Sequence, residues 1–349
     1  MSAGVPRPHL AGDLTAIGGL IAVIVAATIF GGFAAYRALY SPAAFVTNYL
    51  DLLASRHAVE ALAVPGVAID RSQLSAAGLP QDASDALLRQ AALASLTDIH
   101  VVSQKQAGDH TEVTVAYRAG GYPGRTTFDV VRNGWIGIVP GWRFATSPLA
   151  VVDLTVHGSA DFQVNGFPID KRQVSTAGVR ADLAAPVHLL VFSPGLYAVR
   201  VDTSAMSSPT KALLSDAPFR RTAVEVQARP TPEFLSVVQQ RVDEFLTACA
   251  RQHVLQPTGC PFGTQIDDRV AEPPDWSIVK QPVVTLIPDG ENWAIRWAHA
   301  TAHVTVPVQS LFDGSMSTVD ADVPFGVTGS VSVDADGRAT IEITATPND

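Results

Sequence analysis

Cysteine and lysine are scarce in this chain, and its basic residues are not clustered. The 349 residues include two cysteines, Cys249 and Cys260, and only four of the 24 basic residues are lysines. Lysine and arginine form no run longer than a pair, and the formal net charge is −9. Proteins that bind nucleic acid neutralise its phosphates with a clustered basic face. The sequence therefore argues against a nucleic-acid partner.

Motifs of the common enzyme classes are also missing. The sequence contains no Gly-x-Ser-x-Gly, no phosphate-binding loop, no dinucleotide fingerprint and no Ser-x-x-Lys followed by the other motifs of penicillin-binding enzymes. These absences favour a non-enzymatic protein without excluding an enzyme. We expect no cofactor.

Two groups of polar residues have the residue types of metal ligands but not their spacing. His299 and His303 lie in an alternating segment, so they share one face of a strand, and no third ligand is evident. The acidic residues between Asp267 and Asp275 lie in a proline-rich loop without the glycine of a calcium loop. We interpret these groups as polar sheet positions and a solvated loop, with a metal site and a cation site as the alternatives.

One long apolar stretch is present near the N-terminus. Residues 14–36 contain 23 consecutive uncharged residues. A helix of this length spans about 34 Å, slightly more than the ~30 Å hydrocarbon core of a bilayer. We therefore predict a short cytoplasmic tail at residues 1–13 and a transmembrane helix from Leu14 to Tyr36. The alternative, a cleaved signal peptide, has an apolar core of only about 7 to 15 residues.

The predicted membrane helix also has a face of small residues. Ala27, Gly31 and Ala35 lie four apart, a spacing that lets two membrane helices approach closely. Homodimerisation through the anchor is one interpretation, and chance spacing in a helix rich in glycine and alanine is the other. Arg7 and Arg37 give the positive-inside rule too little charge to orient the helix.

The two cysteines indicate the orientation. Cys249 and Cys260 are eleven positions apart, and nearby cysteines in an oxidising compartment usually pair. Closing a loop of this size stabilises the fold by roughly 3 kcal/mol. We predict a disulfide, and with it a single-pass protein of the cell membrane whose bulk lies outside the cytoplasm. The alternative is that Cys249 is a nucleophile with His253 as its base.

The rest of the chain divides into three predicted units. Residues 42–148 begin with helical periodicity and continue as alternating strands. Residues 149–229 consist of short alternating runs separated by glycine and proline, which predict an all-β module. Residues 230–349 again place a helix before strands. This pattern predicts an α+β fold class.

The first unit resembles a known superfamily. It combines predicted helices at residues 43–62 and 84–96 with antiparallel strands, and it ends in the motif GWRFATSPL at residues 141–149. This combination resembles the cone-shaped superfamily named after nuclear transport factor two, which implies a sheet curled around a pocket. A predicted helix at residues 232–254 restarts the pattern, so residues 230–349 are interpreted as a second cone-like α+β domain and a degenerate repeat of the first.

The middle unit and the whole chain carry further resemblances. Val164-Asn165-Gly166 and the later Pro194-Gly195 strand resemble the turns of small surface β-domains. An anchor followed by such units resembles the teicoplanin-resistance-associated membrane proteins of Gram-positive bacteria and related actinobacterial envelope proteins. That family often begins with a cytoplasmic zinc ribbon. Residues 1–13 contain no cysteine, so no role of the ribbon carries over.

Four tryptophans are the candidate pocket residues. If the units are cone-like, Trp135, Trp142, Trp293 and Trp297 are placed to line the two pocket mouths; the alternative is that they are core residues. Our leading hypothesis is a non-enzymatic extracytoplasmic envelope protein with a tethered binding or scaffolding surface for a protein partner or a cell-wall component. The alternatives are a small-ligand-binding or catalytic domain, and an accessory subunit of a secretion, division or wall-synthesis complex.

Overall fold

The computed structural model describes residues 39–346, except for 138, 183, 290–291 and 334–337. Within this part, strands make up 48% and helices 19% of the chain. The predicted α+β class with two cone-like domains is therefore wrong, and the protein is mostly β. The predicted membrane helix at residues 14–36 lies outside the described residues. None of the helices in the described part is long and apolar enough to span a bilayer.

One helix predicted from the sequence does not form, which is one reason that the protein has less helix than an α+β fold. The segment predicted as helical at residues 84–96 contains only a 3-10 turn, Gln90–Ala92. The main chain of Ser84 bonds to a distant strand instead, with its amide 2.8 Å from the His188 carbonyl and its carbonyl 2.8 Å from the Leu190 amide. The helical spacing places Leu87, Leu88, Ala91 and Leu96 on one buried face. Leu87 and Leu96 are buried, but Ala91 is exposed, because long-range pairing replaces the local helix.

The N-terminal unit contains three short helices and a four-stranded meander. Its elements are α2 (Pro42–Ala54), α3 (Ala58–Ala63), α4 (Arg71–Ala76), β1 (Leu96–Ala107), β2 (His110–Ala119), β3 (Tyr122–Ile136) and β4 (Val139–Phe144), with the strands in sequence order. α2 packs on the meander, whereas Leu74 of α4 packs on Val151 and Leu190 of the middle unit.

Arg56, at φ 60°, turns the chain between α2 and α3, so the predicted helix at residues 43–62 is divided. Tyr49 and Phe128 are fully buried and lie against Phe144, with ring centroids 5.1 and 5.7 Å away.

Asn133-Gly134 is a dipeptide typical of hairpin turns, but here it forms a bulge. Both residues lie inside β3, where the register with β4 shifts between Arg132 and Trp135. Gly134 supplies the positive φ of this irregularity, and the chain reverses later, at Gly137. The Asn-Gly dipeptide therefore lies shortly before the chain reversal and does not form it.

The middle unit is built from small sheets. Its elements are β5 (Leu149–His157), β6 (Asp161–Val164), β7 (Phe167–Asp170), α5 (Lys171–Val174), β8 (Val187–Phe192), β9 (Gly195–Arg200), β10 (Met206–Ser207), β11 (Lys211–Ser215), β12 (Arg221–Gln227) and β13 (Arg229–Pro230). They pair in the orders β12-β5-β8, β11-β9-β6-β7 and β10-β13. Asn165 and Gly166 form the β6–β7 turn with φ of 52° and 83°, which confirms the predicted hairpin.

The C-terminal unit pairs one helix with a sheet of very long strands. Its elements are α6 (Pro232–Ala250), β14 (Arg269–Val270), β15 (Asp275–Lys280), β16 (Leu286–Asp289), β17 (Asn292–Gln309), β18 (Met316–Val333) and β19 (Ala339–Thr346). The predicted helix is confirmed, and it ends at Ala250. Thr231 caps its start, where the hydroxyl accepts from the Phe234 amide at 3.2 Å. The sheet order is β14-β17-β18-β19, with β15 and β16 also on β17. This unit is therefore not a repeat of the N-terminal helices and meander.

The predicted disulfide is confirmed. Cys249 at the end of α6 is bonded to Cys260, with the two Cα atoms 5.8 Å apart. The loop that follows sends Phe262 into the core, where its ring centroid lies 5.0 Å from that of Trp276 and 5.1 Å from that of Phe325. The bond therefore fixes a loop whose aromatic side chain completes the packing beneath the long strands.

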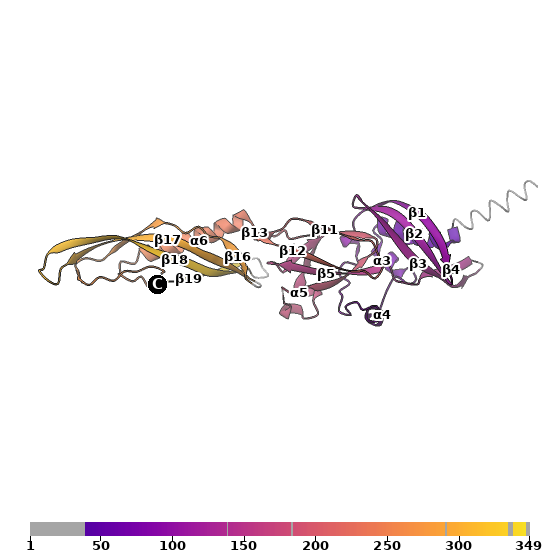
Figure 1. Ribbon diagram of the computed structural model, residues 1–349, viewed down its shortest axis with the longest axis horizontal. Coiled ribbons are helices and arrows are strands. Elements are labelled where there is room, and N and C mark those ends of the chain that lie inside the picture. The colour runs from indigo at the N-terminus through magenta and orange to yellow at the C-terminus, as the bar shows by residue number, and fades with distance from the viewer. Residues whose placement is uncertain (1–38, 138, 183, 290–291, 334–337, 347–349) are drawn as a thin grey trace, which may run out of the picture.

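The units follow one another along an elongated molecule, with β1–β4 at one end and the β17–β18 hairpin at the other (Figure 1). A single hydrophobic core extends through the middle and C-terminal units. Trp293 at the start of β17 belongs to it and is only 3% exposed. Its indole lies over Gly158, which follows β5: a Cβ atom at Gly158 would be 2.6 Å from the ring. Only glycine permits this approach.

We predict that Gly158→Ala destabilises the protein more than Gly166→Ala does. Both glycines have positive φ, at 79° and 83°, so both variants carry the backbone strain of roughly 1–2 kcal/mol. Only the Gly158 variant also collides with Trp293, because nothing lies within 4 Å of a Cβ at Gly166. Overpacking typically adds about 1–3 kcal/mol. Urea unfolding of the two variants measures the difference, and equal losses would disprove the role of this contact.

Candidate binding groove

A largely apolar concavity lies beside the start of α2. It has a volume of about 930 Å³ and runs between α2, the loop after α3 and the end of the first sheet. Phe45 from α2, Val101 from β1, and Val139 and Trp142 from β4 contribute apolar walls. Leu39, the first described residue, lies at the edge of the groove and is 68% exposed.

Local sequence features fix the walls of the groove. Ser41 caps α2 by accepting the Ala44 amide at 3.1 Å, and Pro42 occupies the first turn. The Trp142 indole N–H donates to the Tyr40 carbonyl at 2.9 Å, so β4 holds the chain just before the helix. The groove therefore opens directly where the chain leaves the predicted membrane span.

A cation links the two nearby tryptophans. The Arg132 guanidinium carbon lies 5.2 Å from the ring centroid of Trp135 and 5.9 Å from that of Trp142. Trp142 lines the groove, while Trp135 is 60% exposed on the adjoining surface. The rim thus combines aromatic rings with a positive charge, the composition that favours the interface between a bilayer and water.

The other two predicted pocket residues lie elsewhere. Trp293 is a core residue against Gly158. Trp297 packs on Gly326 and on His299, whose ring centroid is 4.0 Å away, and it remains 43% exposed. The structure therefore brings Trp135 and Trp142 together, but it does not join Trp293 and Trp297 into a second pocket mouth.

The lining of the groove is suited to apolar binding. Among its described residues, Asp51 carries the one carboxylate, and the remaining polar groups are hydroxyls, an amide, the Trp142 indole N–H and main-chain atoms. Catalytic sites usually bring several titratable groups into one cleft. This groove instead offers hydrophobic area with a few polar atoms at its edge, as expected for a binding surface.

A histidine–carboxylate pair was not identified from the sequence. On the middle unit, the Asp153 carboxylate accepts from His188 Nδ1 at 2.6 Å and from Arg221 Nε at 2.6 Å. The three residues come from β5, β8 and β12, which are neighbours in one sheet. Because Arg221 shares the carboxylate, the arrangement is a cross-strand ion-pair network rather than an isolated dyad. Only knowledge of the β5–β8 register could have predicted it.

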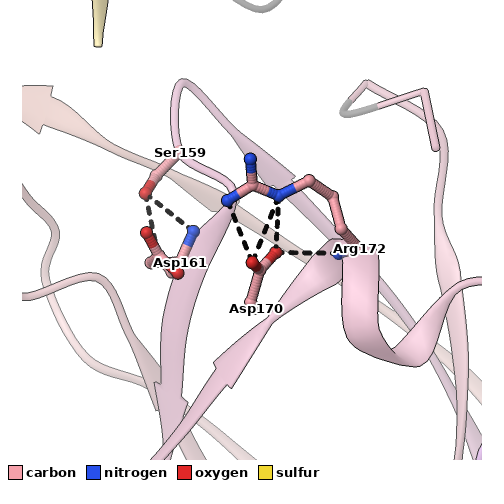
Figure 2. A network of polar contacts seen from close by, with 4 residues as sticks. All are labelled: Ser159, Asp161, Asp170 and Arg172. Atoms are coloured by element: carbon pink, nitrogen blue, oxygen red, sulfur yellow. Dashed lines mark hydrogen bonds and ion pairs between the residues drawn. The ribbon is translucent and has the colours of Figure 1, made fainter. Parts of the chain in front are cut away.

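A second polar cluster lies at the β6–β7 end of the middle unit (Figure 2). Asp170 forms a two-point ion pair with Arg172, with Nε 3.0 Å from Oδ1 and Nη2 2.9 Å from Oδ2. Asp161 lies opposite Asp170 in the strand register, and its main chain bonds to the Ser159 hydroxyl. Both aspartates line a cavity of about 390 Å³. Burial, and then repulsion from Asp170, raise the pKa of Asp161 despite the partly offsetting charge of Arg172.

The remaining candidate residues have structural partners. Cys249 is in the disulfide, so it is not a free nucleophile, and His253 Nδ1 lies 3.1 Å from the Pro274 carbonyl. His303 lies between two acids of β18, 2.8 Å from Asp322 and 3.2 Å from Asp320. The described residues contain no group of three or more acidic, histidine or cysteine side chains placed to hold a metal ion.

Comparison with known proteins adds no relative. The chain matches no protein-family model, and no curated protein or solved structure matches it.

We predict that Asp161→Asn stabilises the protein at neutral pH. Because the folded-state pKa of Asp161 is raised above 3.8, its ionised carboxylate lowers stability at neutral pH. This penalty diminishes as the pH falls through the folded-state pKa, so the variant and the natural protein converge in acid. Urea unfolding from about pH 3 to about pH 8 measures the difference. A variant that is less stable at neutral pH would contradict this prediction.

Proposed function

We propose that the protein is a non-enzymatic extracytoplasmic envelope protein. In this proposal residues 14–36 anchor it in the cell membrane, and the body presents a binding or scaffolding surface to a protein partner or a cell-wall component. The apolar groove beside α2 carries the proposal, because its lining favours binding over catalysis. The sequence resemblance to teicoplanin-resistance-associated membrane proteins agrees with such a role.

The position of the groove suggests the kind of ligand it takes. α2 begins at Pro42, six positions after the end of the predicted span at Tyr36. The groove would therefore lie close to the outer surface of the bilayer, with Trp135 and Trp142 at interfacial depth. A juxtamembrane segment of a partner protein fits this place, since it would arrive at the same depth with an apolar face.

We predict that a crosslinker in the groove traps one partner in cells. Asn48 lines the groove and is exposed, so p-benzoylphenylalanine at this position reaches a bound chain without disturbing the core. Illumination should give one abundant adduct. The same group at Gln240, exposed on α6 in the C-terminal unit, is the matched control. Recovering only the uncrosslinked protein at both positions would count against a partner at the groove.

We predict that the body of the protein is labelled from outside the cell. Since Cys249 and Cys260 are bonded to each other, a new cysteine is the single free thiol. Gln104→Cys, on an exposed position of β1, should react with a membrane-impermeant maleimide in intact cells. Ser2→Cys, in the predicted cytoplasmic tail, should react only after permeabilisation. The reverse pattern would refute the proposed orientation.

A further inference from the structure

Exposed apolar side chains lie at the end of the molecule opposite the β1–β4 sheet. Residues 310–315, here called the distal loop, join β17 to β18 at that end (Figure 1). Leu311 and Phe312 in this loop are 72% and 99% exposed, and Met316 directly after it is 63% exposed. Single exposed apolar residues are common on protein surfaces, but a group of three large ones at a tip marks an interaction site.

Hydrogen bonds hold the distal loop in one conformation. The Ser310 hydroxyl accepts from the Phe312 amide at 3.2 Å, and the Ser310 amide donates to the Ser315 carbonyl at 2.9 Å. Asp313 accepts from the Ser315 amide at 3.1 Å and from its hydroxyl at 2.7 Å. The hydroxyl bond is also the main reason that the pKa of Asp313 is lowered. Phe312 is therefore presented by an ordered loop.

The loop is also fixed to the rest of its unit. The Leu311 amide donates to Asp268 Oδ1 at 3.3 Å, which ties the loop to the segment before β14. Gln309 Nε2 donates to the Gly314 carbonyl at 3.2 Å, and Gly314 adopts a φ of 75°. An aromatic side chain on a pre-ordered loop binds with little further loss of conformational entropy. This is the arrangement of a binding hot spot.

The charged residues near the distal loop indicate which kind of partner can bind it. Asp313 lies in the loop and Asp268 is bonded to it, and Asp267 and Arg269 flank Asp268 in the sequence, so three acids and one base lie in these two segments. An anionic lipid surface would repel these acids, whereas a protein pocket with basic residues around it would attract them. A second copy anchored in the same membrane is disfavoured too. Its groove would lie near the bilayer, while this tip points away from the N-terminal end (Figure 1).

We infer that the distal loop is a docking surface for a partner protein with an apolar pocket and a basic rim. Phe312 fills the pocket, Leu311 and Met316 pack beside it, and the acids face the rim. The inference extends the proposed function, because it assumes that the chain acts by binding. It concerns a different surface from the groove, so the two can fail separately.

The test uses the full-length protein in its own cells. Phe312 is replaced by photoreactive p-benzoylphenylalanine, with the same replacement at Val283, a 77% exposed valine between β15 and β16, as the control. We expect one crosslinked protein from position 312 and none from position 283. That protein is identified and purified, and its binding to the full-length chain is measured. Phe312→Ser should weaken binding about 30-fold, the loss typical of a hot-spot residue.

A second variant tests whether the pocket of the partner protein has basic residues around it. Asp313→Asn removes a charge but keeps an oxygen that accepts from Ser315. It should slow association and weaken its salt dependence, while Phe312→Ser should mainly speed dissociation. Phe312→Ser should unfold at the same temperature as the natural protein, because Phe312 makes almost no packing contacts at 99% exposure. Asp313→Asn should unfold at a slightly lower temperature, because the lowered pKa of Asp313 means that its ionised form stabilises the folded loop.

Four outcomes would overturn the inference. The first is no adduct at position 312, or the same adduct from position 283. The second is an adduct between two copies of this chain. The third is a Phe312→Ser variant that binds the identified protein normally. The fourth is clustering of phosphatidylglycerol vesicles by proteoliposomes of the full chain that depends on Phe312, which would make a bilayer the occupant. An adduct at Asn48 without one at position 312 would leave the proposed function standing and refute this inference alone.

Discussion

The contact between Trp293 and Gly158 determines how the extended molecule is assembled. Trp293 is the second residue of β17, so the orientation of the long hairpin is set where its indole covers the main chain after β5. The N-terminal unit is joined to the middle unit by apolar packing as well as by polar contacts. Leu149, Phe192 and Leu196 of the middle unit belong to the core of the N-terminal unit. Tyr49 donates to the Ser193 carbonyl at 3.2 Å, and Asn165 donates to the Ala92 carbonyl at 2.7 Å. Both surfaces proposed for binding therefore depend on joints inside the molecule.

Local signals in the sequence were read correctly where local interactions decide the structure. Thr231 and the proline after it begin α6, because both act within the first helical turn. Asn165 and Gly166 turn the β6–β7 hairpin, because each tolerates a positive φ. The disulfide followed from two cysteines that are close in sequence. In each case the residues that decide the structure lie within a few positions of one another.

The errors came from interactions between distant segments. The helix predicted at residues 84–96 has suitable periodicity, but its Ser84 bonds to β8, about a hundred positions away. No pattern within the segment reveals that pairing. The same limit applies to the candidate site. Trp142 was identified as a pocket residue, whereas Trp293 is core, and the sequence alone does not distinguish an indole at a groove from one beneath a sheet. Likewise, Asp153 meets His188 only through the register of β5 with β8.

The long strand β17 has a mechanical consequence. It runs from Trp293, at the joint with the middle unit, to Gln309, beside the exposed loop, and its register with β18 shifts once, between Ile295 and Ala298. Its 18 residues are already extended, at roughly 3.3 Å each, so traction on the loop can lengthen it only slightly. Tension would pass along covalent bonds to the joint, while the hydrogen bonds to β18 share the load along their length. The hairpin is therefore stiff along its length. Under force, the packing of Trp293 on Gly158 would be disrupted before the hairpin itself.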